Sequence, residues 1–376
     1  VAINDYRPMD AGGPVHLITM CVNQTNDPRG GIFNRDRQGL PLTIVSGGYM
    51  REGIENWSEM RRDEPLSLGT FIAISGAAIA PALGALTRGG ISALAMFAGL
   101  RLGYWWSNER RNGEGTRSVH AWTGKSRRIL NELRGRFQGT QGPDWFLTDG
   151  GHFENTGAYA LLAERCRVIV VSDAGADPTY AFGDLENLVR KARIDLNADI
   201  RFMRPRNPPD LRLSPPVAEL AQFGTIDDLA SSKSNACMAL ATVIYAEDPL
   251  HPGILIYMKP NFFVGLPVDL VNFKAANPSF PQEPTSDQFF SESQWESYFL
   301  LGQEMGKALS IDLLNCIAAA PDAYFVQDTS STLDKAMTRD KGVVPAGVPA
   351  TPMQAISRIP ARIAVSTVKA PGGLTA

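Results

Sequence analysis

Short runs of hydrophobic residues, bounded by glycine, proline, asparagine or aspartate, recur along much of this chain. They predict strands over residues 15–22, 42–45, 70–74, 144–148 and 167–172. Apolar residues at helical spacing predict helices over 156–165 and 182–196. Strands that alternate with helices on this scale indicate βαβ units and a mainly parallel sheet, so we expect an α/β fold.

The second half of the chain continues this pattern and then loses it. Residues 237–262 predict a hairpin of two strands around a Pro/Gly turn, and residues 291–314 predict one long helix. From about Ser330 the sequence becomes rich in Pro, Ala, Gly and Val without periodicity, which is typical of a tail that is disordered or extended along a partner. We therefore expect an α/β domain over 1–329 and a tail over 330–376.

Residues 91–106 form an apolar run, broken by Arg101, which ends in one tyrosine and two tryptophans. A helix of this length is shorter than the roughly 20 residues needed to cross a bilayer. It is either a core helix or a helix that lies at a membrane surface, where aromatic side chains and a flanking arginine suit the headgroup region.

Composition and charge argue against several classes of function. The 376 residues include 36 basic and 39 acidic side chains, and a net charge of -3 disfavours a nucleic-acid partner. The four cysteines are widely spaced, which argues against a zinc ribbon and against a disulfide scaffold. No Walker A or Rossmann glycine pattern is present. We therefore expect neither a cofactor nor a metal.

The candidate chemistry begins at Asp149, which follows the apolar strand predicted over 144–148 and precedes Gly150 and Gly151. The carboxyl ends of strands are where open α/β sheets place their sites. Glycines without a β-carbon let the backbone approach a substrate closely. The alternative is a plain β-turn with aspartate at its first position.

The segment "DGGHFENTGAYALLAERCRVIVVSDAGADP" (149–178) resembles the aspartate motif of bacterial patatin-like and cytosolic phospholipase A-like acyl hydrolases. "LGTFIAISGAAIAP" (68–81), "RLGYWWSN" (101–108) and residues 277–302 are similar to other parts of that family. The resemblance implies a patatin-like three-layer sandwich with a mainly parallel central sheet. It also implies lipid ester hydrolysis by a Ser-Asp dyad, with Asp149 as general base.

The resemblance does not settle the nucleophile, because the G-x-S-x-G elbow and the G-G-G-x-R oxyanion loop of the family are not intact here. Ser75 in "AISGA" is the first candidate, and Ser46 in "IVSGGYM" is the second. The third alternative is a serine outside this chain, or none. Because the chain begins at Val1, it resembles the carboxyl-terminal part of a large family member, produced by cleavage or as a separate subunit, and the nucleophile would then be on a second polypeptide.

Other residues around the dyad have candidate roles. Gly150, Gly151 and Gly76 are the candidates for oxyanion binding or close backbone approach, and His152 is a candidate substrate contact or a structural loop residue. Asp173 and Asp177 form a second acidic loop, which could bind a cation, although helix capping and turn formation suit them better.

Two functions remain open on these grounds. The first is a serine acyl hydrolase acting on lipid or other esters. The second is a non-catalytic or half-site subunit with a structural, membrane-associated or partner-binding role. Contact with a membrane surface would run through residues 91–106, and the expected location is cytoplasmic or peripheral to a membrane.

Overall fold

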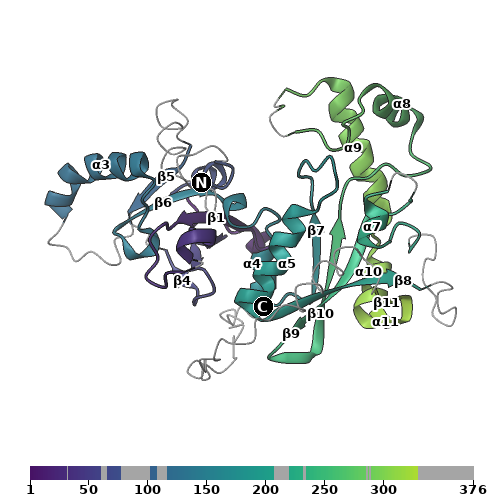
Figure 1. The fold of residues 1–376 in the computed structure, drawn as a ribbon, viewed down its shortest axis with the longest axis horizontal. Coiled ribbons are helices and arrows are strands. Elements are labelled where there is room, and N and C mark those ends of the chain that lie inside the picture. The colour runs from purple at the N-terminus through teal and green to yellow at the C-terminus, as the bar shows by residue number, and fades with distance from the viewer. Residues whose placement is uncertain are drawn as a thin grey trace, which may run out of the picture.

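The chain forms two β-sheets with helices between and around them (Figure 1). The structure is a computed structural model, which describes residues 1–31, 33–60, 66–77, 102–107, 117–206, 220–231, 234–284, 287 and 289–328. The tail predicted over 330–376 and residues 91–101 of the apolar run over 91–106 lie outside the described residues.

The first sheet, called the antiparallel sheet below, has six strands that are all antiparallel to their neighbours. Its strands, in spatial order, are β4 (Ser58–Glu59), β3 (Tyr49–Glu52), β2 (Gly39–Val45), β1 (Leu17–Asn23), β6 (Asp144–Asp149) and β5 (Tyr104–Ser107).

The second sheet, called the mixed sheet, has five strands. Its strands, in spatial order, are β11 (Phe325–Gln327), β8 (Ala198–Pro205), β9 (Met238–Tyr245), β10 (Asp248–Met258) and β7 (Val168–Ser172). Among these described strands, β7 and β10 are the one parallel pair.

The expected fold class is therefore wrong. A patatin-like three-layer sandwich needs a mainly parallel central sheet, and the described strands form an antiparallel sheet and a mixed one. The physical reason is visible at β6 and β7, which the sequence pattern joined through a helix into one βαβ unit. The two strands belong to different sheets, so the helix between them connects sheets and is not a crossover within one.

The described helices are α1 (Leu68–Ser75), α3 (Arg117–Arg134), α4 (Ala158–Ala163), α5 (Gly183–Leu196), α7 (Ile226–Leu229), α8 (Val268–Ala276), α9 (Glu292–Lys307), α10 (Ile311–Ala319) and α11 (Pro321–Tyr324). Short turns of other helix types are η1 (Pro8–Ala11), η2 (Phe33–Arg37), η6 (Gly139–Gln141) and η7 (Gly150–His152). In the part of the chain that these elements cover, no helix combines the length and the apolar character needed to cross a bilayer.

Helix α1 occupies residues for which a strand was predicted, over 70–74. Ser67 begins the helix, because its side chain accepts a hydrogen bond from the Thr70 N–H at 3.0 Å. Phe71 and Ile74, three residues apart, then turn to the same side and are buried against the antiparallel sheet. The cap and this pairing outweigh the strand preference of the β-branched residues in the segment.

The aromatic end of the apolar run over 91–106 also differs from the prediction. Residues 104–107 form strand β5 and not the end of a helix. Trp105 lies opposite Phe146 with ring centroids 5.0 Å apart, and Trp106 lies opposite Trp145 at 5.6 Å. Cross-strand aromatic pairs of this kind stabilise a sheet edge.

Several other predictions are confirmed with small changes of bounds. Strand β6, helix α5 and the β9–β10 hairpin fall where the pattern placed them. The long helix expected over 291–314 is divided into α9 and α10, because Ser310 caps a new helix by accepting the Leu313 N–H at 3.1 Å.

Helices α4 and α5 lie between the two sheets (Figure 1). Their apolar side chains form one buried cluster with residues of β7 and β9 and with Cys21 of the antiparallel sheet. Charged pairs close the edges of this interface. Arg37 binds Asp195 through two contacts of 2.7 and 2.6 Å, and Arg51 pairs with Glu164.

Lys191 of α5 is buried within this interface, where its ammonium group donates to the Phe153 carbonyl and lies 3.6 Å from the centroid of the Phe153 ring. Burial lowers the pKa of Lys191 from 10.5 to about 8. The unfolded chain keeps this proton to higher pH, so the cost of the buried charge is present below about pH 8 and disappears as the pH rises toward 10.5.

We predict that the free energy of unfolding of the wild type will rise relative to Lys191→Met between pH 7 and pH 10. The expected rise is on the order of 2 kcal/mol, measured by urea denaturation. Lys307→Met is the control, since Lys307 is exposed beside Glu304 and should show no such trend. If the free energy of unfolding changed with pH in the same way for the wild type and Lys191→Met, the lowered pKa of Lys191 would be contradicted.

Candidate functional site

Asp149 is the last residue of β6, and the register of β6 with β1 decides which way its side chain points. Asp149 lies opposite Met20, and Leu147 lies opposite Val22. Met20 and Leu147 are both buried in the cluster that α1 covers. Directly opposed residues share a face of the sheet, so Asp149 lies on the face that carries α1.

Ser75 is the last residue of α1 and therefore lies on that same face of the antiparallel sheet. Its hydroxyl donates to the carbonyl oxygen of Thr19 at 2.7 Å. Thr19 precedes Met20, so the hydroxyl is held next to the β-bridge that contains Asp149. The structure thus brings Ser75 and Asp149 to one corner of the sheet, with the serine proton engaged by a backbone carbonyl.

The glycines after Asp149 are required by the close packing of this corner. A β-carbon on Gly150 would lie 2.7 Å from the Thr19 carbonyl oxygen, the acceptor that Ser75 uses. A β-carbon on Gly151 would lie 2.5 Å from Oδ1 of Asn155. Real β-carbons do not approach oxygen so closely, and only glycine lets the turn lie this near both groups.

Two of the three candidate oxyanion donors are already bonded. The Gly151 N–H donates to Oδ1 of Asp149 at 2.7 Å, which fixes the carboxylate at the start of η7. The Gly76 N–H donates to the Ile72 carbonyl at 3.1 Å and ends α1. Gly76 also lies at the carboxyl end of a helix, where the backbone dipole favours positive charge and not an oxyanion.

His152 lies against the other face of β6. Its Nδ1 lies 2.8 Å from Oγ1 of Thr148, and this hydroxyl also accepts from the buried Asn23 amide at 2.8 Å. Thr148 pairs with Cys21 and so points away from the face that carries Asp149. The structure therefore gives His152 a partner on β6 and does not bring it to the Asp149 side.

Ser46, the second candidate nucleophile, lies in the turn between β2 and β3 and is buried. Its Oγ accepts from the His16 N–H at 3.2 Å. The turn is beyond the Leu17–Val45 pair, at the far end of β1 from Asn23. Ser46 is thus a turn-stabilising residue, separate from the Asp149 corner.

Sequence reasoning missed a polar network that continues from Asp149 to the mixed sheet. Asn155, which touches Gly151, donates to Oδ2 of Asp184 at 2.8 Å. The same Asp184 oxygen lies close to Gly175, in the loop that follows β7. This loop is the acidic segment noted in the sequence, and it connects the Asp149 corner to the carboxyl ends of β7 and β10.

At those strand ends, Asp173 forms a buried ion pair with Lys259, with Nζ and Oδ1 3.1 Å apart. Asp173 also accepts from the Tyr257 hydroxyl and from the Gly175 N–H. Burial, followed by the charge of Asp173, raises the pKa of Tyr257 well above its usual range. A single lysine directly after the apolar strand residues 254–258 was the sequence signal for this pair.

Asp177 has the capping role that the sequence analysis favoured over cation binding. Its carboxylate accepts from the N–H groups of Ala181 and Phe182 before α5. Across the described ranges, no three His, Cys, Asp or Glu side chains gather in a way that could hold a metal ion. Lys259 is the cation that Asp173 binds.

Comparison with protein-family models, with curated proteins and with solved structures found no match to this chain.

We predict that Gly150→Ala will lower the free energy of unfolding by about 2 kcal/mol, because the new methyl group meets a strand carbonyl that cannot move aside. Gly302→Ala is the matched control. Gly302 lies in α9 with open space around it, so alanine should raise stability by about 0.5–1 kcal/mol. Equal effects in urea denaturation would show that the corner is less tightly packed than described.

Proposed function

We propose that this chain is a serine acyl hydrolase in which Asp149 is the general base and Ser75 is the nucleophile. The observation that carries the proposal is the register of β1 with β6, which puts the Asp149 carboxylate on the face where α1 ends in Ser75. The resemblance of residues 149–178 to the aspartate segment of patatin-like acyl hydrolases supports the reaction type, although the fold of the described residues differs from that family.

The reaction begins when the Ser75 hydroxyl exchanges its hydrogen bond with the Thr19 carbonyl for one with Asp149. Asp149 takes the hydroxyl proton as the serine oxygen attacks the ester carbonyl carbon, which forms a tetrahedral oxyanion. The carbon–oxygen bond to the alcohol then breaks, and Asp149 returns the proton to the leaving alkoxide. Water, deprotonated by the same carboxylate, releases the acid and restores Ser75.

The surroundings of Asp149 are suited to a base that keeps one orientation. The Gly151 N–H holds one carboxylate oxygen, and the register of β6 keeps the side chain on the face of the sheet where α1 ends. Asn155 and Asp184 fix the turn from the opposite side. A base held in this way loses little entropy when it binds the serine proton.

The second candidate function is a half-site or non-catalytic module, and a specific observation favours it. The Ser75 hydroxyl and the Gly76 and Gly151 N–H groups are all bonded within the chain, so an oxyanion that uses either of these N–H groups would have to displace a bond. In this alternative, Asp149 serves a hydroxyl on a second polypeptide, or the chain binds a membrane or a partner without catalysis.

Hydrolysis of p-nitrophenyl esters by purified protein tests the first function. We predict that Asp149→Asn and Ser75→Ala will each lower kcat by about 100-fold or more, because each removes a proton-transfer partner. Asp36→Asn, at an exposed carboxylate in η2, is the control and should keep the full rate. Activity that survives in Asp149→Asn would exclude the dyad.

Labelling with a fluorophosphonate separates the two functions. The hydrolase requires a label on Ser75, located by peptide mass spectrometry, that is lost in Asp149→Asn. A chain that takes no label alone, and whose addition makes a co-purified serine protein reactive, would instead support the half-site.

A further inference from the structure

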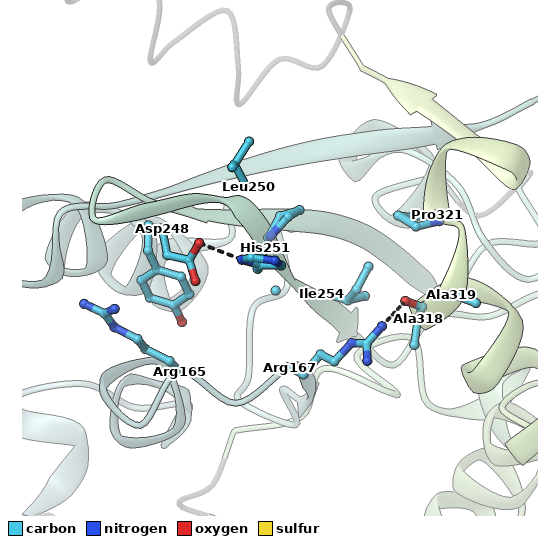
Figure 2. A pocket seen from close by; sticks show the side chains of 12 residues that line it. Arg165, Arg167, Asp248, Leu250, His251, Ile254, Ala318, Ala319 and Pro321 are labelled. Carbon is cyan, nitrogen blue, oxygen red and sulfur yellow. Dashed lines mark hydrogen bonds and ion pairs between the residues drawn. The ribbon is translucent and has the colours of Figure 1, made fainter. Parts of the chain in front are cut away.

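A cavity of about 530 Å³ lies at the amino ends of β7 and β10, and Figure 2 shows the side chains that line it. Its walls are the segment before β7, the tip of the β9–β10 hairpin and the end of α10. Three side chains that can carry positive charge line it, namely Arg165, Arg167 and His251, together with one carboxylate, Asp248. This volume is within the range of small-molecule sites.

Arg167 is held in the cavity wall by the last turn of α10. Its Nη2 donates to the Ala318 carbonyl at 3.0 Å (Figure 2). Cations are favoured at the carboxyl end of a helix, so this bond sets the position of the guanidinium. Within the described ranges, Arg167 forms no ion pair with a carboxylate, and a guanidinium has five N–H donors. Its charge and its other donors therefore remain for a ligand.

Arg165 has a backbone conformation that disfavours any residue with a β-carbon. Its φ of 54° lies in the left-handed region, at the position after α4 where glycine is the usual residue. A side chain there costs about 1 kcal/mol. Arginine is nonetheless present, with its guanidinium 5.3 Å from the centroid of the Tyr245 ring and paired with Glu247 at 2.9 Å. Together these two contacts fix the Arg165 side chain at the wall of the cavity.

The carboxylate of Asp248 does not oppose a bound anion strongly, because His251 binds it. Nδ1 of His251 lies 2.8 Å from Oδ1 of Asp248 (Figure 2). This contact leaves Nε2 as the ring nitrogen that a ligand can reach. Arg167 and His251 thus come from two sides of the cavity, one from the segment before β7 and one from the hairpin tip.

The rest of the lining is apolar. Leu250, at the mouth of the cavity, is 84% exposed, and Ile254 lies deeper beside Arg167. A bare inorganic ion would leave this surface in contact with water. An organic ligand would bury it and gain about 25 cal/mol for each Å² covered.

We propose that this cavity binds a compact oxyanion, a carboxylate or a phosphate, that is joined to an apolar group. Arg167 binds the oxyanion through paired N–H donors, His251 contributes a further contact, and Leu250 and Ile254 cover the apolar group. The site is independent of the proposed hydrolase function, and none of its residues belongs to the Asp149 corner.

Titration calorimetry of the full chain with octanoate, octyl phosphate, 1-octanol and inorganic phosphate tests the proposal. At least one of the two octyl anions should bind at least tenfold more tightly than 1-octanol and than inorganic phosphate. The octanoate and octyl phosphate arms decide between carboxylate and phosphate as the natural group. Binding of 1-octanol as tight as that of both anions would overturn the proposal, and so would binding of neither anion.

Variants test the role of Arg167. Arg167→Leu should weaken binding of the preferred anion about tenfold or more, and Arg167→Lys should weaken it less, because lysine keeps the charge without the paired donors. Arg190→Leu, at an exposed arginine paired with Glu186 on α5, is the control and should bind as the wild type does. Unchanged affinity in Arg167→Leu would overturn the proposal.

His251→Ala provides a second test that does not depend on how Arg167→Leu folds. His251 is 80% exposed at its side chain, so its removal should leave the thermal midpoint unchanged. The affinity for the preferred anion should nevertheless fall by about threefold or more. An unchanged affinity would show that His251 does not contact the ligand. It would overturn the proposal that Arg167 and His251 bind the anion from two sides.

Discussion

The pairing of β1 with β6 is the constraint on which the rest of the Asp149 corner depends. It joins residues more than a hundred positions apart in the sequence and fixes Asp149 opposite Met20. A shift of one residue would turn Asp149 to the opposite face, toward α4 and α5, and would expose Leu147 from its buried cluster. The buried side chains of β6 thus specify the direction of the carboxylate as well as the stability of the strand.

Local features of this fold could be predicted from the sequence. Strand β6, the β9–β10 hairpin and helix α5 have the apolar spacing that their final positions require. The assignment of strands to sheets could not be predicted in the same way. A strand, a helix and a strand in succession, such as β6, α4 and β7, give the same sequence pattern in two cases. The helix can cross over within one sheet, or it can connect two sheets, as it does here.

The candidate site also has some features that local sequence predicts and others that depend on contacts between distant segments. The position of Asp149 and the need for glycine after it follow from the order of residues in the chain, as does the capping by Asp177. The engagement of Ser75 with Thr19 depends on α1, which formed where a strand was predicted. The pairing of Asp173 with Lys259 depends on the parallel contact of β7 with β10. Such long-range contacts leave at most a single-residue signal in the sequence, such as Lys259 after the apolar residues of β10.

The order of the strands along the chain has a consequence for synthesis on the ribosome. All described strands of the antiparallel sheet precede residue 150, and all those of the mixed sheet follow residue 167. Strand β6 is the last of its sheet to emerge, although its place is between β1 and β5. Until it arrives, the β1 edge is unpaired and open to association with other nascent chains. The antiparallel sheet is therefore complete only after residue 149 has been synthesised, when β6 can join β1 to β5.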